Sequence, residues 1–131
     1  MIEGAFNQYR EAALDLTLRG PTGYEERLEF IVDTGFDGAL LVHSSVAAAL
    51  DLPPLGSERA MLADGSITEF TVSEALLLWD GMLRALPVHV ADSVSHLGMQ
   101  VLDGHELRIH AVPNGIVQIT PLAEPLDKQA A

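Results

Sequence analysis

The chain of 131 residues contains no cysteine. It can therefore form neither a disulfide framework nor a metal site built on thiolates. Its length is that of one compact domain. Hydrophobic residues make up 48% of the sequence, which is enough for a hydrophobic core, so a disordered chain is not expected.

Positive charge is also scarce. Lys128 is the only lysine, and the formal net charge is −12. Nucleic-acid binding depends on clustered Lys and Arg side chains that neutralise phosphates, so we expect no nucleic-acid partner. The acidity favours solubility and does not indicate a fold.

Long hydrophobic runs are missing as well. Apolar runs such as 75–79 and 30–32 are only a few residues long, whereas a membrane-spanning helix needs about 20 apolar residues. The segment Met1–Gly4 lacks the basic and apolar regions of a signal peptide. We therefore expect a cytoplasmic protein with no membrane partner.

Turn signals, by contrast, are frequent. Asp-Gly occurs at 37–38, 64–65, 80–81 and 103–104, and Asn-Gly at 114–115. Such pairs tolerate the positive φ angles of tight hairpin turns. Short runs between them alternate apolar and polar residues or are rich in strand-forming residues, and predict strands at 13–18, 28–32, 59–63, 66–71 continuing to 79, 82–90, 107–112 and 116–119.

Helix-forming segments are few. Ser44 or Ser45 could cap a short helix through 46–50, and a single helical turn is possible at 99–102. Many short strands at regular spacing predict an all-β barrel or sandwich-like domain. We place this domain at 13–121, between an N-terminal extension at 1–12 and a polar C-terminal tail at 122–131.

The segment 30–35 is the best candidate for chemistry. A strand of bulky apolar residues leads directly into Asp33, Thr34 and Gly35. Gly35 allows the backbone to turn tightly beside the carboxylate, and the hydroxyl of Thr34 can hold the loop by hydrogen bonding. Asp-Thr-Gly is also common in exposed turns, so the tripeptide alone does not establish catalysis.

Further segments in the same order extend this motif. The sequence resembles the bacterial single-domain branch of the retropepsin-like aspartic proteases. Gly65 and Gly98 follow Asp33 by 32 and 65 positions, and the resemblance covers roughly Ala13 to Pro121. The segments that carry it are 32–38, 62–66, 97–99 and 102–107.

The resemblance implies a closed, six-stranded-type acid-protease barrel with one or two short helices, active as a homodimer. It implies a catalytic Asp33 within a loop completed by Thr34 and Gly35, and a flap whose tip is at Gly65. Leu97-Gly98 would pack behind the active loop. The substrate-binding residues implied are Phe36, Ala63, Asp64, Gly65 and Gly98.

Two positions depart from the usual pattern of the family. Phe36 stands where retroviral members usually carry a small residue, as in the bacterial branch. His96 stands before Leu97, where the family usually has an apolar residue, and this bears on the local packing.

Only one Asp-Thr-Gly is present. Aspartic protease chemistry needs two facing carboxylates, one protonated and one ionised. A symmetric dimer supplies both from two copies of Asp33. One would act as general base on a water and the other would donate a proton to the peptide carbonyl. A peptide or protein substrate is expected, with no metal and no organic cofactor.

Two alternative functions remain open. The main alternative is a non-proteolytic dimerisation or peptide-binding module of the same fold, and the third hypothesis is a plain structural β-domain.

Other motifs give weaker matches. The spacing of Asp33, Gly35 and Asp37 imitates a calcium loop, but Ser44 stands where such a loop has Glu. His105 and His110 fall on opposite faces of a strand, so they do not predict a shared metal. Gly-x-Ser-x-Gly and P-loop motifs are absent.

Overall fold

The computed structural model describes residues 1–61 and 64–123, and this part of the chain is built mainly of strands. Two short helices accompany them, so the prediction of an all-β fold with short helices is confirmed. In chain order the elements are β1 (Ile2–Phe6), β2 (Ala12–Arg19), β3 (Glu25–Val32), β4 (Leu40–His43), α1 (Ser44–Ala49), β5 (Gly56–Met61), β6 (Ile67–Trp79), β7 (Met82–Ala91), β8 (His96–Leu97), α2 (Met99–Leu102), β9 (His105–Ile109) and β10 (Ile116–Pro121).

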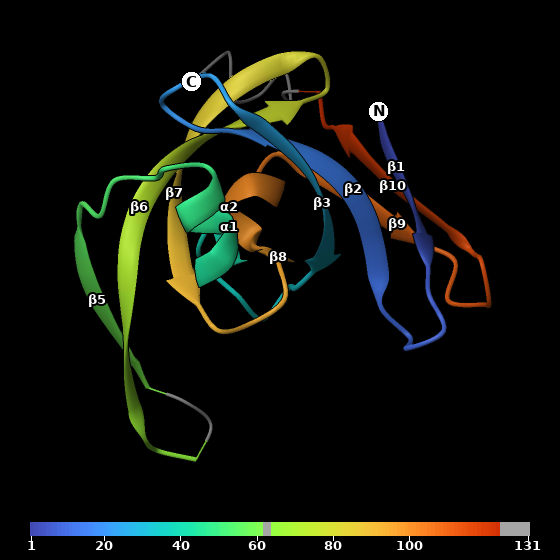
Figure 1. Cartoon of the computed structure of the whole chain (residues 1–131). Coiled ribbons are helices and arrows are strands. Elements are labelled where there is room, and N and C mark those ends of the chain that lie inside the picture. Colours follow the sequence, from blue (N-terminus) through green and yellow to red (C-terminus); the bar gives the residue numbers. More distant parts are fainter. Residues whose placement is uncertain (62–63, 124–131) are drawn as a thin grey trace, which may run out of the picture.

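The strands form one sheet in which six strands close into a ring. β2 pairs with β3 on one side and with β6 on the other, so the pairing runs β2, β3, β8, β4, β7, β6 and back to β2. β5 extends the sheet beyond β6, and β1, β10 and β9 extend it beyond β2. Figure 1 shows the hairpin of β5 and β6 projecting away from the ring, and β1, β10 and β9 together on the side of β2.

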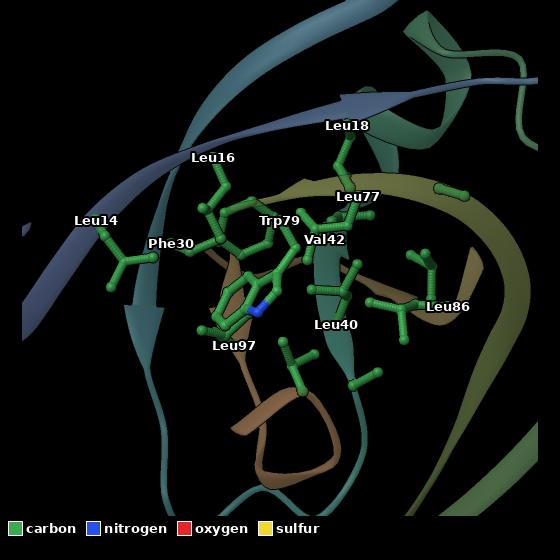
Figure 2. Close-up of a cluster of buried hydrophobic side chains, with 14 of the residues drawn as sticks. Leu14, Leu16, Leu18, Phe30, Leu40, Val42, Leu77, Trp79, Leu86 and Leu97 are labelled. Atoms are coloured by element: carbon green, nitrogen blue, oxygen red, sulfur yellow. The ribbon is translucent and has the colours of Figure 1, made fainter. Parts of the chain in front are cut away.

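The core lies inside this ring and follows from the two-residue period of the strands. In β2, Leu14, Leu16 and Leu18 are buried, whereas the intervening Asp15 is exposed. Figure 2 shows these leucines together with Phe30 and Trp79 in one apolar cluster. Burial of one such side chain contributes about 1.5–3 kcal/mol, so the alternation that is visible in the sequence is also what holds the ring together.

The Asp-Gly pairs have different fates. Asp80 and Gly81 both have positive φ, at 50° and 85°, and form the predicted hairpin turn between β6 and β7. Gly65 (φ 86°) lies in the connection between β5 and β6, as expected, and Gly104 (φ 78°) connects α2 to β9 instead of two paired strands.

The pair at 37–38 does not form the hairpin turn that its sequence predicts. Neither residue has positive φ, and the strands on either side, β3 and β4, do not pair with each other. β8 lies between them and pairs with both. The segment 33–39 is therefore a loop that passes around the end of an inserted strand.

The helices are short, and the cap of α1 differs from the prediction. The helix begins at Ser44, which was itself one of the two expected caps, so the N-cap is His43 and neither of the two serines. The His43 Nδ1 accepts a hydrogen bond from the Ser45 backbone N–H at 3.0 Å. Within the described ranges no helix is long and apolar enough to cross a membrane.

The N-terminal segment takes part in the sheet. β1 pairs antiparallel with both β10 and β2, so residues 2–6 are sheet residues, and the division proposed at 12 and 13 does not coincide with an edge of the sheet. At the other end, the Leu122 N–H donates to the Gly104 carbonyl at 2.9 Å. The predicted tail at 122–131 otherwise falls largely on 124–131, which lie outside the described residues.

Candidate active site

Asp33 is the first residue after β3, and its surroundings fix its carboxylate. Its backbone N–H donates to the Leu97 carbonyl at 2.9 Å, and its carbonyl accepts from the Phe36 N–H at 3.1 Å. Its Oδ1 accepts from the Gly35 N–H at 3.0 Å. The carboxylate thus stands inside a tight turn, with one oxygen already held by the backbone of its own loop. Thr34 and Gly35 are exposed on that turn.

The segment that follows β8 holds the loop from behind. The Gly98 N–H donates to the Ala39 carbonyl at 2.8 Å, and the Met99 N–H donates to the Phe36 carbonyl at 2.8 Å. A Cβ added at Gly98 would collide with the Gly38 carbonyl oxygen and would lie 2.6 Å from the Phe36 ring. Only glycine allows this approach of the two backbones, which accounts for the Leu-Gly sequence after His96.

A pocket of about 360 Å³ opens beside the Asp33 loop. It combines carboxylates, imidazoles and apolar side chains, contributed by the loop and by β4 to β8. This mixture suits a ligand with both polar and apolar groups, such as a peptide. The residues that line it are Asp33, Gly35, Phe36, Asp37, Gly38, Leu41, Glu58, Ala60, Met61, Phe70, His89 and His96.

The predicted site residues are only partly brought together there. Asp33, Gly35 and Phe36 line the pocket, whereas Gly98 lies behind the loop and is not among the lining residues. Thr34, Asp64 and Gly65 are also not among them, and Ala63 lies outside the described residues. The roles assigned to these residues in substrate binding therefore stay predictions.

The end of the β5–β6 hairpin has an ordered turn of its own. The Asp64 Oδ1 accepts from the Ser66 hydroxyl at 2.6 Å and from the Ser66 N–H at 2.9 Å. These hydrogen bonds lower the pKa of the Asp64 carboxyl below its ordinary value of 3.8. Because the folded-state pKa is lowered, the stabilisation is fully present above pH 3.8 and is lost as the pH falls through the lowered value. The Asp64 carboxylate therefore keeps these hydrogen bonds to a lower pH than an aspartate without them would.

Several strand residues that line the pocket were not predicted from the sequence. Glu58 of β5, Phe70 of β6 and His89 of β7 meet on one face, where the Glu58 Oε2 lies 3.3 Å from the His89 Nε2. The rings of Phe36 and Phe70 both pack edge-to-face with His89, with centroids 5.6 Å and 6.1 Å away. The two-residue period would have placed Glu58 on the face of Ala60, but it does not indicate that this face turns toward Asp33.

His96 was also not predicted as a pocket residue, and its ring contacts the Asp33 carboxylate. Its Nδ1 lies 3.1 Å from the Asp33 Oδ2. The sequence marked His96 only as a departure from the family pattern. The hydrogen-bonding partners of the Asp33 carboxylate in the described chain are thus the Gly35 N–H and the His96 ring.

Comparison with known proteins supports the fold. No protein-family model and no curated protein matches the sequence. Among solved structures, a retropepsin-like aspartic protease from Rickettsia conorii is similar over 88% of each chain, at 19% identity and a TM-score of 0.65. The EIAV protease in complex with the inhibitor HBY-793 is similar over 75% of this chain and 90% of its own, at 16% identity and a TM-score of 0.55. The fold is therefore retropepsin-like.

The close approach at Gly98 gives a first test. Gly98→Ala forces the Asp33 loop to move, because the obstructing atom is a backbone oxygen. We expect a loss of about 1–3 kcal/mol in the free energy of unfolding, as for other overpacked sites. Gly56→Ala is the matched control, since a Cβ there meets nothing within 4 Å. Denaturant unfolding of both variants is the measurement, and equal stabilities would remove the packing role of Gly98.

Proposed function

We propose that this protein is an aspartic endopeptidase that acts as a homodimer on peptide or protein substrates. The observation that carries the proposal is the Asp33 carboxylate, fixed in a glycine-locked loop at the edge of a pocket, on a retropepsin-like fold. A structural β-domain needs neither a held carboxylate nor a pocket beside it. Both of the similar solved structures are proteases, which supports a protease function on this fold.

The proposed chemistry needs two copies of the chain. In the dimer, the Asp33 carboxylates of both protomers face each other and share one proton, because two like charges so close do not both stay ionised. The ionised member removes a proton from a water, whose oxygen attacks the peptide carbonyl. The protonated member gives its proton to the carbonyl oxygen. Collapse of the tetrahedral intermediate then breaks the C–N bond. The carboxyl that took the proton from water gives it to the leaving nitrogen, and one hydroxyl of the intermediate returns its proton to the other carboxylate.

The main alternative is a dimerisation or peptide-binding module without catalysis. The same pocket and fold would serve such a module, so the distinction lies in Asp33 alone. A binding module would tolerate an amide at this position, since shape and most hydrogen-bonding capacity are retained. An endopeptidase would not, since the pair could no longer exchange a proton. Substitution of Asp33 therefore separates the two functions.

The first prediction concerns this carboxylate. Asp33→Asn removes both ionisable members of the dimeric pair at once, so cleavage of a proteome-derived peptide library should fall by at least about 100-fold. The fold should survive, because the amide oxygen still accepts from the Gly35 N–H. Asp51→Asn, on an exposed turn after α1, is the matched control and should cleave normally. Cleavage by purified Asp33→Asn at the wild-type rate would end the catalytic assignment.

The second prediction concerns assembly. Specific activity should rise with protein concentration as monomers pair, and sedimentation should detect a dimer under the same conditions. Mixing wild type with Asp33→Asn should then lower activity more steeply than the wild-type fraction, since mixed dimers lack one carboxylate. A strictly proportional decrease, or a fully active monomer, would contradict the shared dyad.

The third prediction concerns the hairpin tip. Gly65 has φ of 86°, a conformation that a β-branched residue adopts at a cost of about 1–3 kcal/mol. If the tip closes over substrate, Gly65→Val should lower turnover about tenfold or more while dimerisation is unchanged. Gly23→Val is the matched control, because Gly23 has nearly the same φ of 88° in the β2–β3 turn. Equal turnover of the two variants would remove the flap assignment and leave Asp33 unaffected.

A further inference from the structure

Two neighbouring strands hold His96 in its position. It is the first residue of the two-residue strand β8, which pairs parallel with β3 and antiparallel with β4. The next residue, Leu97, is fully buried in the core. Because successive side chains of a strand point to opposite faces, His96 points away from the core and toward the pocket. Two neighbouring strands therefore fix the backbone from which the imidazole reaches Asp33.

The contact engages the second oxygen of the Asp33 carboxylate. The His96 Nδ1 lies 3.1 Å from Oδ2, while Oδ1 accepts from the Gly35 N–H. The side chains of His96 and Asp33 are 26% and 36% exposed, so solvent screens the contact only in part. An ionised Asp33 can only accept, and the Nδ1 of the His96 beside it then carries the hydrogen. The contact is a hydrogen bond when His96 is neutral and an ion pair when it is protonated.

We propose that His96 is a positioning residue for Asp33, which holds the carboxylate in place and favours its ionised form, and so sets the pH range of cleavage. The proposal rests on the proposed endopeptidase function. Histidine is suited to this role because it changes charge near neutral pH. In the dimer each Asp33 brings its own His96, so the pair of carboxylates lies between two imidazoles.

Other charged groups face His96 across the pocket. Asp37 lies on the same loop as Asp33, Glu58 on β5 and His89 on β7, and all three line the pocket with His96. Glu58 lies against His89, at 3.3 Å between Oε2 and Nε2. These groups contribute to the field around the site, but the ring in hydrogen-bonding contact with Asp33 is that of His96.

The pH–rate profile should shift in the direction set by the ionised form of Asp33, which the contact with His96 favours. Catalysis needs one proton on the pair of carboxylates, so the rate should follow a bell-shaped pH profile centred on the acidic side of neutral. A donor on each carboxylate favours the ionised forms and moves both limbs of the bell toward lower pH. Removing the donor should move both limbs toward higher pH.

The test is the pH–rate profile of two His96 variants on one peptide. His96→Leu removes the donor beside the carboxylate, and both limbs should move to higher pH. His96→Asn keeps an N–H donor but cannot become charged, so its profile should lie between those of wild type and His96→Leu. The change should appear in kcat more than in KM, since His96 acts through Asp33. His110→Asn, on an exposed residue after β9, is the matched control.

A purely structural His96 would give a different result. Loss of packing would lower the rate at every pH without displacing the limbs, and thermal unfolding would report the same loss. A His96→Leu profile that superimposes on wild type after scaling, with a stable fold, overturns the proposal. If His96→Leu does not fold, a His96→Asn profile at the wild-type position does so.

A second readout is independent of activity. The histidine side chains of the wild type and of Asp33→Asn are titrated by ¹⁵N NMR, and His96 is assigned by the signals that vanish in His96→Asn. Loss of the carboxylate should change the ¹⁵N signals of the His96 ring, because Nδ1 loses its contact with Oδ2, and unchanged signals overturn the proposal. His96 signals that respond to Asp33→Asn in a protein that cleaves no peptide would refute the endopeptidase function and leave the contact between His96 and Asp33 established.

Discussion

The site depends on a contact between two backbones in which no side chain intervenes. At Gly98 the chain approaches the loop of Asp33 so closely that a single methyl group would strike a carbonyl oxygen. Hydrogen bonds from Gly98 and Met99 to the carbonyls of Ala39 and Phe36 then fasten the loop. Because these are backbone groups with little freedom, the Asp33 carboxylate has an orientation before any ligand arrives. Preorganisation of this kind is what electrostatic catalysis and specific binding both require.

Much of the fold could be predicted from the sequence, because its signals are local. The alternation in β2 and the Asp80-Gly81 turn are encoded within a few residues, and both appear in the structure as predicted. The pair at 37–38 has the same local signal, yet it forms no hairpin, because β8 at 96–97, far along the chain, lies between its flanking strands. The cap of α1 differs from the prediction because a histidine ring nitrogen, and not a serine hydroxyl, accepts the hydrogen bond at the start of the helix.

The residues of the candidate site also differ in whether a local sequence signal could identify them. Asp33 could be found because its motif is contiguous in the sequence. Glu58, Phe70, His89 and His96 are separated along the chain and meet only through pairing across the sheet, so no spacing rule indicates that they share one pocket. His96 shows the limit most clearly. A polar residue at a position expected to be apolar signalled an anomaly, but only the three-dimensional arrangement shows which oxygen it contacts.

The two-residue strand β8 also has a consequence for how the protein acquires its structure. β3 and β4 are close in sequence, but one edge of each strand stays unpaired until residues 96 and 97 lie between them and pair with both. Chains dominated by contacts between residues so far apart tend to fold slowly. The loop of Asp33 cannot make its final hydrogen bonds until residues 97–99 have docked against it. A chain still emerging from the ribosome would not have a formed site until the segment beyond residue 98 had been synthesised and had docked.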